Sequence, residues 1–122
     1  MPARTLRQHL EHVYAALKYS LQGILTAARG ETAFRQEVLA LLGLPIAAYA
    51  YGAPPAQIAV IIAGWLLVMA FELMNMAVES LCNLVSPDFH PLVKTAKDAA
   101  SAAVFLAILA NAAYWLHLIR VY

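Results

Sequence analysis

Charged residues are scarce in this chain, and their scarcity excludes most soluble folds. They make up 12% of the 122 residues, against roughly 25% in ordinary soluble domains. No residue between Val38 and Phe71 is charged, and 63% of the chain is hydrophobic. A soluble domain of this size cannot bury so much apolar surface, so the composition predicts an integral membrane protein. The net charge of +1 gives no reason to expect a nucleic-acid partner.

The sequence also lacks the motifs of several enzyme classes. Its single cysteine, Cys82, excludes an intrachain disulfide, and no group of cysteines and histidines has the spacing of a zinc site. There is no G-x-x-x-x-G-K-[ST] phosphate loop, no G-x-G-x-x-G loop, no protein-kinase signature and no nucleophile elbow. Any phosphate chemistry must therefore use another arrangement.

Four stretches have helical patterns, and we expect one all-α membrane domain over residues 1–122. In residues 5–29, apolar residues recur every three or four positions. This pattern is typical of a helix lying in the headgroup plane or of a core-facing helix, and the lack of a soluble core favours the first. Residues 33–51, 56–85 and 92–119 are the predicted membrane helices.

Basic residues predict how these helices are oriented. They precede the first and third membrane helices, whereas the turn at residues 52–55 has none. By the positive-inside rule, the N-terminus and the loop at residues 86–91 are cytoplasmic and the C-terminus is outside. The basic residues concerned are Arg4, Arg7, Lys18, Arg29, Arg35, Lys94 and Lys97.

An acidic stripe interrupts the second membrane helix. Glu72, Asn75 and Glu79 have the spacing i, i+3, i+7, which puts them on one helix face over a rise of about 10.5 Å. One acidic side chain at the bilayer centre costs roughly 2.5–3.5 kcal/mol on insertion scales, so the stripe indicates a site. Glu72 is either a proton acceptor or a protonated carboxyl bonded to Asn75 or a neighbouring helix. Glu79, with Glu31, either binds a divalent cation or forms ordinary interfacial charges, with Glu79 paired to a lysine.

Further polar residues lie at the predicted cytoplasmic end. Lys97 and Asp98 either hold a phosphate and a metal or ribose hydroxyl, or form an anchoring charge pair. His90 is more typical of a solvated or capping histidine than of a ligand, and Ser101 either faces a headgroup or mediates a helix contact. The residues themselves thus indicate a small membrane protein with an acidic cytoplasmic site, but no particular reaction.

Three motifs together resemble the prokaryotic diacylglycerol kinase family, which includes the undecaprenol kinases. They are E-T-A-F-R-Q-E at residues 31–37, E-L-M-N-M-A-V-E at residues 72–79, and H-P-L-V-K-T-A-K-D-A-A-S-A-A at residues 90–103. Their order and spacing match over most of the chain. The resemblance implies a homotrimer of three-span subunits in the bacterial inner membrane, each subunit with an amphipathic surface helix. It places active sites at subunit boundaries on the cytoplasmic face.

The resemblance also implies roles for individual residues. The activity would be Mg²⁺-dependent transfer of the ATP γ-phosphate to a lipid hydroxyl, with Glu72 as the base and Glu31 and Glu79 holding the metal. The implied nucleotide contacts are His12, Tyr19, Glu31, Asn75, Glu79, Asp88, His90, Lys97 and Asp98. The implied lipid contacts are Ala33, Phe34, Arg35, Gln36, Glu37, Glu72 and Ser101.

Two positions depart from the family pattern, and the lipid acceptor stays open. Asn83 stands where the family commonly carries an aspartate, and His12 matches an arginine associated with ATP. Diacylglycerol is the expected acceptor, and undecaprenol is the alternative within the family. An alternative of another class is a non-catalytic assembly or ion-binding subunit.

Overall fold

Four α-helices make up the described part of the chain. The computed structural model describes residues 5–122, which form α1 (Leu6–Gly30), α2 (Thr32–Ala50), α3 (Pro55–Val85) and α4 (Pro91–Val121). Each helix begins and ends within two residues of the predicted bounds, so the all-α prediction is confirmed. Arg4, one of the basic residues used to predict orientation, lies outside the described residues.

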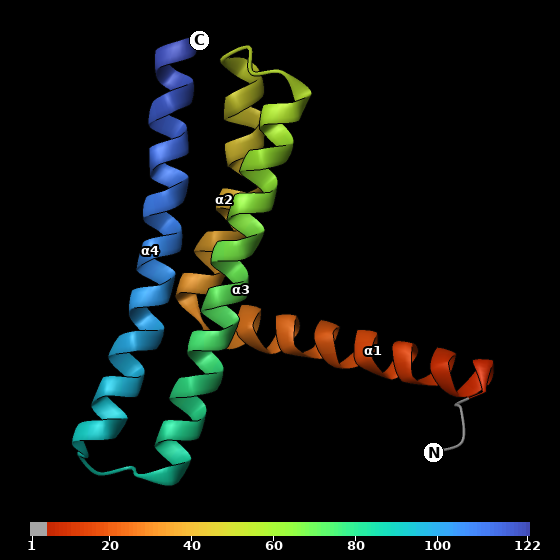
Figure 1. Cartoon of the computed structure of the whole chain (residues 1–122), viewed down its shortest axis with the longest axis vertical. Helices are drawn as coiled ribbons and strands as arrows, with labels where there is room; N and C mark the ends of the chain where they lie inside the picture. Colours follow the sequence, from red (N-terminus) through yellow and green to blue (C-terminus); the bar gives the residue numbers. More distant parts are fainter. Residues whose placement is uncertain (1–4) are drawn as a thin grey trace.

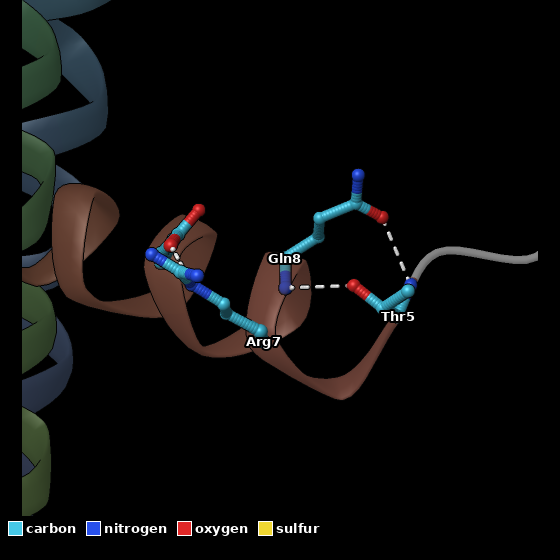
Figure 2. A network of polar contacts seen from close by, with 4 residues as sticks. Thr5, Arg7 and Gln8 are labelled. Carbon is cyan, nitrogen blue, oxygen red and sulfur yellow. Dashed lines mark hydrogen bonds and ion pairs between the residues drawn. The ribbon is translucent and has the colours of Figure 1, made fainter.

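A capping box fixes the start of α1. Thr5 Oγ1 accepts a hydrogen bond from the Gln8 backbone N–H at 3.4 Å, and Gln8 Oε1 accepts one from the Thr5 N–H at 2.9 Å (Figure 2). These bonds satisfy donors that a helix N-terminus otherwise leaves unpaired. Close by, Arg7 pairs with Glu11 at 2.9 Å. The helix start is therefore stabilised by local contacts alone.

Short connections join α2, α3 and α4. Gly52, between α2 and α3, has φ +86°, a backbone region that residues with a Cβ rarely adopt. Pro55 follows in the first turn of α3, where its missing N–H costs nothing. At the other end, His90 Nδ1 accepts a hydrogen bond from the Leu92 N–H at 3.2 Å. This cap, followed by Pro91, starts α4 and confirms the interpretation of His90 as a capping residue.

The helices α2, α3 and α4 run alongside one another, and α1 projects crosswise from them (Figure 1). Along the chain, α2, α3 and α4 alternate in direction (Figure 1). Since α3 has 31 residues and α2 has 19, α3 is longer by about 18 Å at 1.5 Å per residue. In Figure 1, α3 and α4 continue past the level of α1 toward their connecting loop. That loop is thus held well beyond the corner between α1 and α2.

Few apolar side chains are buried within one chain. A small core of Ala48, Ala53, Ile61 and Leu118 lies near the α2–α3 turn. By contrast, many large apolar residues of α3 and α4 are exposed, Leu106 by 63%. Both helices are long and apolar enough to cross a membrane, and an 18-residue stretch of each has mean hydropathy 2.1 and 1.8, respectively. Apolar helices with so much open surface fit a lipid environment, as the composition predicts.

One polar contact ties α3 to α4 at mid-length. Asn111 Nδ2 donates to the carbonyl oxygens of Gly64 at 3.1 Å and of Ala107 at 2.9 Å. A Cβ on residue 64 would lie 2.6 Å from Asn111 Oδ1, which is too close for van der Waals contact. The absence of a side chain at Gly64 therefore permits this helix–helix contact.

Candidate functional site

The corner between α1 and α2 is braced by an arginine. Glu31 is the single residue between the two helices and has an extended backbone, with φ −114° and ψ 119°. Arg35 Nη1 donates to the carbonyl oxygens of Ala28 and Arg29, both at 3.1 Å, and its Nη2 donates to Thr32 Oγ1 at 3.0 Å. A cation suits the carbonyl-rich C-terminus of α1. Arg35 thereby ties the last turn of α1 to the first turn of α2, on either side of Glu31.

Two carboxyl groups are buried where α2 packs against α3. Glu37 of α2 is 7% exposed and Glu72 of α3 is 8% exposed. Phe34 and Val68, one turn from each, are almost completely buried. Glu37 Oε2 has no hydrogen-bond partner, and the charge of Glu72 repels that of Glu37. Burying acids is costly, so this pair is a candidate functional site.

Two more carboxylates lie within electrostatic range of Glu72. Both Glu31 and Glu79 repel its charge. Glu31 and Asn75 are half-buried, whereas Glu79 is exposed. The stripe on α3 therefore runs from a buried acid to an exposed one.

Glu31 and Glu79 have the oxygen donors that Mg²⁺ prefers, but they would need a further ligand to complete its coordination shell. Within residues 5–122, no three side chains of His, Cys, Asp or Glu converge as metal ligands. Mg²⁺ usually takes one or two protein carboxylates and completes its octahedron with water and substrate phosphates. Glu31 and Glu79 supply hard oxygen donors in that number. The donor set suits a metal bound together with a nucleotide.

A pocket of about 350 Å³ lies at the α3–α4 loop. It collects most of the loop-side residues that the sequence analysis selected, and its polar lining residues are Ser86, Asp88, His90, Lys94, Lys97 and Asp98. Lys94 forms an ion pair with Asp98, whereas Lys97 Nζ donates to Asn83 Oδ1 at 2.7 Å. The predicted Lys97–Asp98 charge pair is thus replaced by two separate contacts.

Two of the contacts expected for the acids on α3 are not formed within one chain. In the part of the structure that is described, Glu79 forms no ion pair with a lysine, and Glu72 forms no hydrogen bond with Asn75. Neither carboxylate is therefore held by the partner that its sequence position suggested.

Other selected residues stay apart from this loop. His12 and Tyr19 are exposed on α1, and α1 packs against α2 and α3 but not, over the described residues, against α4. Ser101 is exposed on α4, and Ala33 and Gln36 are exposed on α2. A single chain therefore does not gather all the selected residues around one point.

A groove of about 470 Å³ between α1 and α3 was not predicted from the sequence. Its walls come from residues near the acidic stripe on α3 and, on α1, from an isoleucine and three small or hydroxyl residues at helical spacing. They are Ser20, Gly23, Ile24, Thr26, Leu73, Met76, Ala77 and Ser80. The spacing of Ser20, Gly23 and Thr26 was the available signal.

Two more contacts escaped sequence reasoning. Trp65 Nε1 donates to the backbone oxygen of Glu37 at 2.7 Å, and Asn111 bonds across to α3. Asn111 could have been found as a lone amide in an apolar helix. No sequence signal identifies the partner of Trp65, because that partner is a backbone atom.

Comparison with known proteins confirms the resemblance. The family model described as "Prokaryotic diacylglycerol kinase" matches residues 18–119. The diacylglycerol kinase of Pseudomonas aeruginosa is 42% identical over 106 residues, covering 87% of this chain and 86% of that protein. That of Haemophilus influenzae is 40% identical over 107 residues (87% and 90%), and that of Escherichia coli strain K12 is 33% identical over 103 residues (84% of each). The chain belongs to the prokaryotic diacylglycerol kinase family.

Proposed function

We propose that this protein is a lipid kinase that transfers the γ-phosphate of ATP to the hydroxyl of 1,2-diacylglycerol, producing phosphatidic acid and ADP. The observation that carries the proposal is the buried Glu72, flanked by Glu31 and Glu79, in a chain of this family. The relatives reported above are all named diacylglycerol kinases, which favours this acceptor over undecaprenol.

Glu72 acts as the general base. It accepts the proton of the lipid hydroxyl while that oxygen forms a bond to the γ-phosphorus and the bond to the ADP oxygen breaks. The proton then leaves to water. The groove between α1 and α3 lies on the neighbouring face of α3, since Leu73, Met76 and Ser80 among its walls each follow a residue of the acidic stripe by one position. An acyl-bearing alcohol in that groove reaches the acid from the membrane side.

The nucleotide enters from the loop side. Glu31 and Glu79 would hold Mg²⁺, which would supply positive charge to offset that of the transferred phosphate. Lys97 adds a cation, and Asn75, Asp88, His90 and Asp98 line the nucleotide site. Phosphoryl transfer depends mainly on positioning and charge neutralisation, so no phosphate loop is required.

We further propose a homotrimer of three-span subunits in the bacterial inner membrane. The exposed apolar surface of each chain supports assembly, and so does the separation of His12 and Tyr19 on α1 from the α4 residues. In the trimer, α1 of one subunit lies close to the loop of another. Lipid contacts come from Ala33 to Glu37, Glu72 and Ser101. The N-terminus and the α3–α4 loop are cytoplasmic, α1 lies along the headgroups, and the extension of α3 and α4 carries the loop into water.

The test is a lipid panel assay. Purified protein in bilayers receives radiolabelled ATP, Mg²⁺ and diacylglycerol, undecaprenol or another lipid alcohol. We expect labelled phosphatidic acid as the main product. Faster labelling of undecaprenol would reassign the acceptor, and no labelled lipid from any alcohol would favour the non-catalytic alternative. Native mass spectrometry of the same sample tests the trimer, and a stable monomer would contradict the shared site.

A further inference from the structure

One hydrogen bond joins the tryptophan side chain of α3 to the backbone of α2 beside the buried acids. Trp65 Nε1 donates to the carbonyl oxygen of Glu37 at 2.7 Å in a partly buried setting. Of the side-chain hydrogen bonds over residues 5–122, this is the one that links α2 with α3. A backbone carbonyl has two lone pairs, so the indole adds to the internal helix bond rather than replacing it.

The direction of this bond matters for the carboxyl group of Glu37. In an α-helix, carbonyls point toward the C-terminus while side chains tilt toward the N-terminus. The indole therefore bonds to Glu37 on the side that faces the C-terminus of α2, and the carboxyl group leans toward the N-terminus of α2. Because α2 and α3 are antiparallel (Figure 1), the direction toward the N-terminus of α2 runs along α3 from Trp65 toward Glu72.

Trp65 and Glu72 share one face of α3. Their separation of seven residues returns to the same side of the helix after about 10.5 Å, and Val68 between them is fully buried. The contact surface with α2 thus contains, in order along α3, the indole bond, a packed valine and the buried acid. A slide of α2 along α3 would break the bond at Trp65 and change the separation of Glu37 from Glu72.

We propose that Trp65 is a positioning residue that fixes where Glu37 lies along α3 relative to Glu72. It thereby holds the two buried carboxyl groups in the arrangement needed for phosphoryl transfer. This rests on the proposed role of Glu72 as the base. Trp65 itself touches neither substrate. Its effect reaches the reaction through the backbone of α2.

The chain offers a matched control, because it has two tryptophans. Trp115 Nε1 is also buried but has no hydrogen-bond partner. Trp115→Phe therefore removes an indole N–H that bonds to nothing, and we expect kcat and both KM values within about twofold of the unsubstituted protein. In this background Trp65 is the sole tryptophan. A tryptophan-auxotrophic host can then replace its indole with benzothienylalanine, which keeps the ring size but has no N–H.

Kinetics of the folded protein test the proposal. With benzothienylalanine at position 65, we expect kcat for lipid phosphorylation to fall about tenfold because the acids are misplaced, while KM for ATP is unchanged. Trp65→Phe in the full chain should show the same split between kcat and KM. An unchanged kcat per folded protein, or equal losses in kcat and nucleotide affinity, would overturn the proposal.

A spectroscopic measurement separates this proposal from the proposed function. In Trp115→Phe protein, the indole N–H band of Trp65 in ultraviolet resonance Raman spectra should be that of a hydrogen-bonded donor. A free indole would overturn the positioning role, whatever the activity. If the bond is present but the unsubstituted protein phosphorylates no lipid alcohol, the proposed function fails and the positioning role falls with it. If the unsubstituted protein transfers phosphate and kcat is the same with benzothienylalanine at position 65, only the positioning role is rejected.

Discussion

Lys97 Nζ lies 2.7 Å from Asn83 Oδ1, and this hydrogen bond joins the last turns of α3 to the start of α4. The neighbouring Lys94 is neutralised by Asp98. Lys97 is instead held by an amide, which orients the ammonium group without cancelling its charge. The pocket at the α3–α4 loop therefore keeps one cation available for an anionic ligand.

Replacing this amide with a carboxylate should weaken nucleotide binding. Asn83→Asp creates an ion pair with Lys97 that competes with phosphate, and a partly exposed pair is worth about 0.2–1 kcal/mol. We expect KM for ATP to rise by up to about fivefold, with KM for the lipid unchanged. In a Lys97→Met background the same substitution should have no such effect. An equal rise in both backgrounds would show that Asn83 acts on something other than Lys97.

Removing the acid of Glu72 should stop transfer without unfolding the protein. Glu72→Gln is nearly isosteric and cannot accept the hydroxyl proton, so we expect kcat to fall by roughly 10²–10⁴-fold. Stability should stay equal or increase, because a buried and repelled charge is removed. Denaturant unfolding and radiolabelled transfer are measured on the same preparation. Glu11→Gln, at an exposed ion pair on α1, is the control, and full activity of Glu72→Gln would reject the base.

Magnesium dependence should separate Glu31 and Glu79 from Glu72. Chelation should abolish transfer. Glu31→Gln and Glu79→Gln should each raise the Mg²⁺ concentration for half-maximal rate by about tenfold or more, since each removes a metal ligand. Glu72→Gln should lower the rate at every Mg²⁺ concentration but leave the midpoint in place. A shifted midpoint in Glu72→Gln, with none in the other two variants, would reverse the assignment.

A methyl group at position 64 should displace the amide that joins α3 to α4. Gly64→Ala places a Cβ 2.6 Å from Asn111 Oδ1, so the Asn111 side chain must move and lose its bond to the Gly64 carbonyl, at a cost of about 0.5–1.5 kcal/mol. Gly43→Ala is the matched control, because nothing lies within 4 Å of its Cβ and alanine favours a helix by up to about 1 kcal/mol. Unfolding in detergent compares the two variants. Adding Asn111→Ala should restore part of the loss in Gly64→Ala, and a Gly64→Ala protein as stable as Gly43→Ala would contradict the close approach.

Local patterns were enough to predict the four helices. The Pro54–Pro55 turn, the 86–91 loop and the apolar periodicity each depend on neighbours in the chain, so the helix bounds came within two residues of those observed. The acidic stripe was equally accessible, because helical spacing alone puts Glu72 and Glu79 on one face. The family followed from three motifs in order.

The partners of individual side chains were beyond sequence reasoning. Lys97 has Asp98 beside it in the chain, yet it bonds to Asn83, fourteen residues away. Arg35, selected as a lipid contact, also braces the corner between α1 and α2 through backbone carbonyls. Such pairings depend on how one helix is rotated and displaced relative to the other. The periodicity of the sequence determines neither the rotation nor the displacement.

The sequence by itself determined a four-helix membrane protein of known family with acids on one helix face, because composition, spacing and turn residues act locally. Only the tertiary structure decided that Glu37 is buried with Glu72, and that Trp65 holds the backbone of Glu37. The physical reason is that burial and hydrogen bonding between helices depend on how far α2 is displaced along the axis of α3. Side chains far apart in the sequence determine that displacement together.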